Sequence, residues 1–245
     1  MLKSITFLCL NLILNFSIFS QTKSYQGEII YNANLTIDDN FNAINNSNIS
    51  DSAKKIAITS LKKLDSILYK LNFNKNESIF KEENKLEIKK SKNFLIRILV
   101  GEGIYYTNKK TNKIFNQKES FGELFIIEIP QFKWKLSRES KKIGKYICYK
   151  ATSTKSIESR RGKSIKKITA WYTPDLPISF GPKDYYGLPG LILELNEGDL
   201  FFKATKIKLN LKQKNDIKEP VKGKKITLEE YSKIVKEIIT KSGRN

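Results

Sequence analysis

The chain has 245 residues, contains no histidine, and carries a formal charge of +20 from 45 lysines and arginines against 25 aspartates and glutamates. Without histidine, Ser-His-Asp and Cys-His nucleophiles and histidine-ligated zinc sites are excluded. Carboxylates, tyrosine, lysine and serine remain as acids, bases or nucleophiles, but no local motif selects any of them. We therefore expect a protein that is not an enzyme and has no cofactor or metal, with a glycosidase-like carboxylate pair or a Ser-Lys hydrolase as the weakest alternative.

The basic charge predicts attraction to anionic surfaces. No RNA-recognition, helix-turn-helix or zinc-finger signature is present, so we expect no nucleic-acid partner. Lipopolysaccharide, acidic glycans or an acidic protein fit an exported protein better. The alternative is compositional bias, because lysine, asparagine and isoleucine are all abundant, as in proteins from AT-rich genomes.

Residues 1–20 have the pattern of a signal peptide, with a charge at Lys3, an apolar stretch at 5–16 and a small residue, Ser20, before Gln21. We expect cleavage after Ser20 and export to the periplasm or cell surface. A membrane anchor is the alternative, but the stretch is shorter than the roughly 20 residues that span a bilayer, so the mature protein is not expected to be transmembrane.

Cleavage removes Cys9 and leaves Cys148 as the single thiol of the mature chain. An intramolecular disulfide is then excluded, so the fold must be stabilised by burial. Cys148 lies in an alternating run, which favours a small buried hydrophobic residue over a reactive thiol.

The mature chain begins with an alternating, β-rich strand at 27–37, followed by a polar loop at 38–51. From Ser52 apolar residues recur at helical spacing, which predicts an inserted helix near 52–69 with Ser50 or Asp51 as its cap. Strands at short intervals then indicate antiparallel hairpins rather than βαβ units. These strands are expected at 70–80, 94–100, 104–108, 113–119, 123–128, 132–136, 144–152, 166–173, 191–195 and 200–211.

One mainly β (α+β) domain is therefore expected over 21–211, followed by a mobile basic linker at 212–226. Thr227 and Glu230 have the spacing of a capping box, which predicts an amphipathic helix over 227–241. We expect this helix to dock on its own sheet rather than on a partner.

A proline-rich segment follows the strand that contains Trp171. Pro174, Pro177, Pro182 and Pro189 stiffen the backbone and remove amide donors, so this segment cannot be a central strand. Pro189 followed by Gly190 predicts a type II turn with a positive φ at Gly190.

This rigid loop allows two interpretations. It could be a preorganised binding rim, since ordering it on contact would cost little entropy, or a plug that closes the open end of a sheet, which we favour. Asp175 and Asp184 are the polar groups of interest, although the sequence pairs neither. The candidate binding residues are Trp171, Tyr172, Asp175, Tyr185, Tyr186, Gly187, Leu188, Pro189 and Gly190.

Residues 187–192 read Gly-Leu-Pro-Gly-Leu-Ile, and the chain resembles the GLPGLI family of exported Bacteroidetes proteins, which is named for this hexapeptide. The resemblance extends over about Gly27 to Leu209. It implies a cell-envelope protein of a family that often accompanies outer-membrane transport genes and is known for export rather than for an activity. The stretches that carry the resemblance are 134–136, 142–152, 169–174, 177–182 and 187–192.

Two hypotheses follow. In the first, a curved antiparallel sheet or half-barrel holds a lipid or other apolar ligand on its concave face, with the proline loop as a gate. In the second, the protein is an accessory subunit that docks on an outer-membrane transport receptor through its loop and basic surface.

Overall fold

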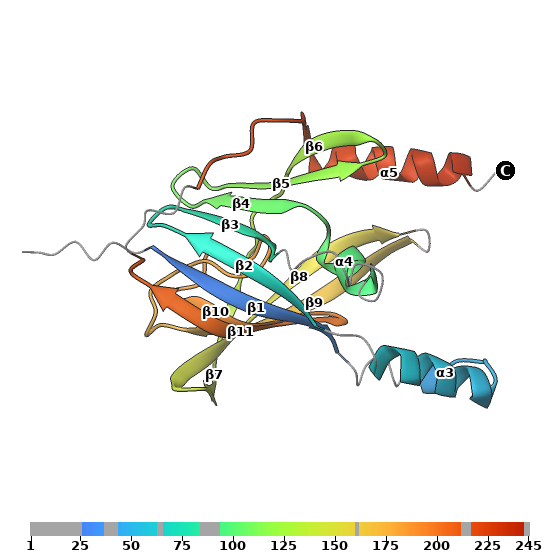
Figure 1. Cartoon of the computed structure of the whole chain (residues 1–245), viewed down its shortest axis with the longest axis horizontal. Helices are drawn as coiled ribbons and strands as arrows, with labels where there is room; N and C mark the ends of the chain where they lie inside the picture. Colours follow the sequence, from blue (N-terminus) through green and yellow to red (C-terminus); the bar gives the residue numbers. More distant parts are fainter. Residues whose placement is uncertain are drawn as a thin grey trace, which may run out of the picture.

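The computed structural model describes residues 26–36, 44–62, 66–83, 94–159, 162–211 and 217–242. The predicted signal peptide lies outside these residues. In the described part, twelve strands form one curved, unclosed sheet in the order β12-β6-β5-β4-β3-β2-β1-β11-β10-β9-β8-β7 (Figure 1). The expected fold class, a mainly β protein with a curved antiparallel sheet, is confirmed.

The strands are β1 (Gly27–Leu35), β2 (Ile67–Phe73), β3 (Glu77–Glu82), β4 (Ile104–Asn108), β5 (Lys113–Ser120), β6 (Glu123–Glu128), β7 (Lys135–Ile143), β8 (Tyr146–Ser159), β9 (Gly162–Thr173), β10 (Leu191–Glu197), β11 (Leu200–Leu209) and β12 (Lys224–Thr227). Every pair is antiparallel except β12 and β6, which are parallel. In the middle of the sheet β1 pairs with β2 on one side and with β11 on the other, with Gly27 opposite Leu209.

The helix expected near 52–69 is shorter. Helix α3 (Asp51–Lys62) ends before β2, which begins at Ile67. Buried residues alternate with partly exposed ones along β2, so the hydrophobic period of this segment is two, as in a strand, rather than the 3.6 of a helix. The buried residues are Ile67, Tyr69, Leu71 and Phe73. Figure 1 shows α3 projecting from the end of the sheet where β1 stops.

The strand expected at 70–80 is two strands, β2 and β3, joined by a tight turn. The side-chain oxygen of Asn74 accepts hydrogen bonds from the backbone N–H groups of Asn76 (2.9 Å) and Glu77 (2.8 Å). This Asx turn reverses the chain inside the predicted run.

The strand expected at 94–100 is a helix, α4 (Phe94–Val100). A short run of apolar residues does not distinguish a buried strand from a buried helix. Ile96 and Val100, four residues apart, are both buried on the helix face that packs against β1 and β11. Arg97 binds Glu82 at 2.7 Å and fixes the helix to β3.

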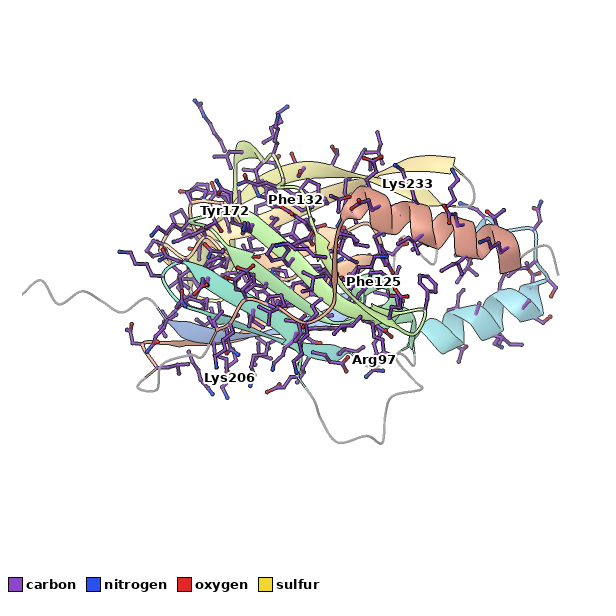
Figure 2. The ribbon with its side chains drawn as sticks, turned by 90° about the horizontal axis from the view of Figure 1, so that it is seen from above. Arg97, Phe125, Phe132, Tyr172, Lys206 and Lys233 are labelled. Atoms are coloured by element: carbon purple, nitrogen blue, oxygen red, sulfur yellow. The ribbon has the colours of Figure 1, made fainter. Side chains whose placement is uncertain are left out.

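The end of the predicted linker is also ordered, because β12 adds to the sheet edge beside β6. The C-terminal helix α5 (Leu228–Ser242) follows, and its capping box is confirmed. Thr227 N donates to Glu230 Oε2 (2.7 Å) and Glu230 N donates to Thr227 Oγ1 (3.2 Å). Tyr231 packs on Phe125 of β6, so α5 docks on its own sheet, as Figure 2 shows beside Phe125.

Replacing Thr227 by alanine is expected to lower the free energy of unfolding of α5 by about 1 kcal/mol, because it removes the N-cap oxygen. Hydrogen exchange of the α5 amides measures this local change. Thr240→Ala is the matched control, since the Thr240 hydroxyl donates to Lys236 O inside the helix and is not part of a cap. Equal hydrogen-exchange rates of the α5 amides in the two variants would show that the capping box does not stabilise the helix.

The main hydrophobic core lies on the concave side of the sheet. Stacked and edge-on contacts join Tyr31, Tyr69, Phe80 and Phe202 from β1, β2, β3 and β11. Cys148 belongs to this core and is fully buried, and burial raises the pKa of its thiol to about 11, which confirms the prediction of a buried residue. Within the described residues, no helix is long and apolar enough to cross a membrane.

Candidate functional site

The proline loop, residues 174–190, connects β9 to β10 and contains only an isolated bridge between Phe180 and Tyr186. Six of its apolar side chains belong to the same core cluster as the strands and are at most 8% exposed, whereas Pro174, Pro177 and Pro189 are exposed. The loop therefore packs into the core, which favours the plug interpretation over a binding rim. These buried side chains are Leu176, Ile178, Phe180, Tyr185, Tyr186 and Leu188.

The candidate binding residues are split by this arrangement. Trp171 is partly exposed on the outer face of the sheet, whereas Asp175, Gly187 and Pro189 are exposed in the loop. The others are buried, so the nine residues do not form one continuous surface. The buried ones are Tyr172, Tyr185, Tyr186, Leu188 and Gly190.

The turn prediction at Pro189 and Gly190 is wrong. The positive φ, 94°, is at Gly187, and Gly190 is not in the left-handed region. Gly190 instead allows close backbone approach, because a Cβ there would lie 2.1 Å from the carbonyl oxygen of Thr173. Backbone hydrogen bonds from Gly187 N to Ser179 O (2.8 Å) and from Leu191 N to Leu176 O (2.9 Å) fix the loop on both sides.

Two consecutive loop residues form ion pairs inside the core. Lys183 Nζ lies 2.6 Å from Glu197 Oε2 of β10, and both side chains are only 5% exposed. Lys155 Nζ of β8 lies 3.2 Å from Asp184 Oδ2, with exposed fractions of 24% and 0%. We call these four residues the ionic cluster. Lys183 has φ 54°, and a non-glycine residue in this region costs about 1–2 kcal/mol, so the fold accepts strain at the cluster.

The cluster is electrostatically coupled. Burial alone would raise the pKa of Glu197, but the positive charges of Lys183 and Lys155 and the hydrogen bond from Lys183 hold it below its ordinary value of 4.5. Burial and the nearby carboxylates of Glu197 and Asp184 raise the pKa of Tyr185. Asp184 Oδ1 is buried without a hydrogen-bond partner. The cluster therefore contains a buried acceptor whose hydrogen-bonding capacity is not used.

Of these four residues the sequence singled out only Asp184. A signal for Lys183 exists, since Lys183 and Asp184 are the only charged residues between Leu176 and Leu193. Lys155 and Glu197 carry no such signal, because they occupy ordinary alternating positions on strands. In the described part of the chain no three His, Cys, Asp or Glu side chains gather to hold a metal ion.

On the outer face, Trp171 belongs to a second group of charges. Lys141 Nζ lies 4.5 Å from the centre of the Trp171 ring and 2.5 Å from Glu194 Oε2. Lys203 Nζ lies 3.3 Å from the other oxygen of Glu194. The indole is thus covered by a cation rather than open to an apolar ligand.

An exposed apolar row lies near the free edge of the sheet. Leu136 of β7 is opposite Ala151 of β8, and Ile147 and Tyr149 lie at the same parity on β8 and so face the same side. Leu136, Ile147 and Tyr149 are 54%, 47% and 37% exposed, and we call them the docking row. The Tyr149 ring also contacts Tyr172 of β9.

A model of a family described as "Protein of unknown function (Porph_ging)" matches residues 134–167 and 158–194. This stretch runs from the start of β7 into β10, so it contains both the docking row and the proline loop. Comparison with curated proteins gives no match.

Among solved structures, the chain is similar to PNGF-II in its P21 and C2 crystal forms, at 18% and 17% sequence identity. Each comparison has a TM-score of 0.47 and covers 86% of this chain but 32% of the other. This chain therefore spans about a third of PNGF-II, and a likeness at this level carries no information on function.

Proposed function

We propose that the protein is exported to the cell envelope and acts there without catalysis, as an accessory subunit that docks on an acidic partner protein. The observation that carries the proposal is the docking row of Leu136, Ile147 and Tyr149, exposed on adjacent strands at one edge of the sheet. Neighbouring large apolar side chains on a surface are typical of interaction sites, whereas single ones are not.

The charges around the docking row favour an acidic partner. Strand β7 carries four cations and one carboxylate, Glu139, which is already paired with Lys150. A positive rim around an apolar centre steers an acidic surface into contact and selects against basic ones. The four cations are Lys135, Arg138, Lys141 and Lys142, of which Lys141 is paired with Glu194.

The partner is inferred to be an envelope protein. The resemblance to exported envelope proteins supports this location, and an outer-membrane transport receptor with an acidic face fits the chemistry of the docking row. The N-terminal residue of protein isolated from the envelope tests export. We expect Gln21, and a mature chain that begins at Met1 in the cytosol would contradict it.

A lipid or other apolar ligand is the second candidate, favoured by the apolar concave face of the sheet. The proline loop and α4 already cover that face. Exposing the six buried loop side chains would cost about 1.5–3 kcal/mol each, a sum comparable with the 5–15 kcal/mol that stabilises a whole domain. Because gating would thus cost about as much as unfolding, the geometry supports docking better. Binding of a lipophilic dye by the native protein would favour the lipid-binding function over docking.

Replacing Ile147 and Tyr149 together by serine is expected to weaken partner binding at least tenfold. Two apolar side chains at the centre of an interface together contribute more than about 1.4 kcal/mol to the binding free energy, which corresponds to a tenfold change in affinity. Affinity is measured on envelope protein recovered by crosslinking in cells and then purified. Ile165→Ser is the matched control, because Ile165 is 73% exposed on β9 outside the docking row. Equal affinity of the double variant and the control, or a recovered partner that is basic, would contradict the proposal.

A further inference from the structure

The contact between Lys155 and Asp184 places an amine against a carboxyl group in a shielded position. Lys155 Nζ lies 3.2 Å from Asp184 Oδ2, and the Asp184 side chain is fully buried. The rings of Phe132 and Tyr185 cover the amine, with ring centres 5.5 and 5.9 Å from Nζ. The amine and the carboxyl group are therefore held together by β8 and the proline loop, and the carboxyl group is shielded from water.

An ion pair in this position is poorly compensated. The fully buried Asp184 carboxyl group gives up its hydration, and its Oδ1 gains no hydrogen bond in return. Condensation of the amine with the carboxyl group requires one proton to pass from Nζ to the carboxylate, and it replaces both charges by a neutral amide, which costs less to bury.

A proton acceptor is available in the same ionic cluster. Glu197 is buried, and its Oε2 accepts a hydrogen bond from Lys183. The charge of Lys155 contributes to lowering the pKa of Glu197, so the two side chains interact electrostatically. Glu197 is therefore the carboxylate of the ionic cluster that we assign to proton transfer between the attacking amine and the departing hydroxyl.

We propose that Lys155 and Asp184 form an intramolecular isopeptide bond as the chain folds. The lone pair of the neutral Nζ attacks Cγ of protonated Asp184, the Nζ–Cγ bond forms, and the Cγ–OH bond breaks. One proton from Nζ leaves with the hydroxyl as water, so the reaction needs no oxidant, reductant or cofactor. The link would tie the proline loop to β8, in a protein whose described residues include one cysteine, Cys148, and so no disulfide.

Mass spectrometry of the folded, purified protein tests the bond. The denatured protein is expected to be lighter, by one water molecule, than the mass calculated from its determined N-terminal residue. After tryptic digestion, peptide 151–160 is expected to remain uncut at Lys155 and to be joined to peptide 184–203. A full calculated mass, with cleavage after Lys155 and two separate peptides, would overturn the proposal.

The chain supplies an internal control and matched variants. Lys150 lies 2.9 Å from Glu139, closer than Lys155 lies to Asp184, but this pair is 28% and 60% exposed and is expected to stay unlinked. Lys155→Arg should restore the full mass, whereas Lys150→Arg should keep the loss of water. Asp184→Asn should lose ammonia instead and give the same final mass as the wild type. If a variant does not fold, the wild-type mass still decides.

Discussion

Replacing Glu197 by glutamine is expected to lower the free energy of unfolding by about 3–5 kcal/mol, because Lys183 is then left buried without a counter-charge. Urea unfolding followed by tryptophan fluorescence measures the change. Glu139→Gln breaks the exposed pair with Lys150 and is expected to cost less than about 1 kcal/mol. A Glu197 variant as stable as this control would show that the buried pair contributes little.

The same substitution has a pH dependence of known sign. The pKa of Glu197 in the folded protein lies below its ordinary value of 4.5, so its pairing stabilises the fold fully above pH 4.5. That stability is lost as the pH falls through the lower, folded-state pKa. The difference between wild type and Glu197→Gln should therefore be constant near neutral pH and shrink in acid. A difference that grows in acid would contradict the assignment.

Replacing Gly190 by alanine is expected to lower the free energy of unfolding by about 3 kcal/mol or more, the upper end for overpacking. The new Cβ would lie 2.1 Å from Thr173 O and 2.9 Å from Pro174 N, and neither backbone atom can move without shifting the end of β9. Thermal or urea unfolding gives the size of the effect.

Gly187→Ala is the matched control for Gly190→Ala. Gly187 has φ 94°, but the nearest atom to a Cβ there is Gln131 Nε2 at 3.9 Å. The cost is then the left-handed backbone alone, about 1–2 kcal/mol. A larger loss at Gly187 than at Gly190 would mean that backbone strain outweighs the close approach to Thr173.

Periodicity located the strands whose residues alternate cleanly, and the predicted bounds of β4 and β6 coincide with the observed ones. Periodicity failed where a strand and a helix share the same sequence pattern. The run at 94–100 is apolar throughout, and only packing against β1 and β11 makes it a helix. Strand β12 has one buried residue, Ile226, among lysines, so its pairing with β6 leaves almost no pattern in the sequence.

The proline loop was predictable as a rigid, non-strand segment, because proline acts through local geometry. The ionic cluster could not be predicted from the sequence. Lys155 meets Asp184, and Lys183 meets Glu197, only because the loop turns into the core and the strand registers bring β8 and β10 beneath it. Ion pairs that depend on strand register across the sheet cannot be recognised from the spacing of charged residues in the sequence.

The pairing of β1 with β11 joins the two ends of the domain, since Gly27 lies opposite Leu209. A growing chain cannot complete the centre of this sheet until nearly all of its residues have been synthesised, and such late, long-range closure is slow. Pairing of β1 with β2 can form early, but β1 stays unpaired on its other side until β11 has been made. The middle of the sheet is therefore expected to close last, after the hairpins on either side of it.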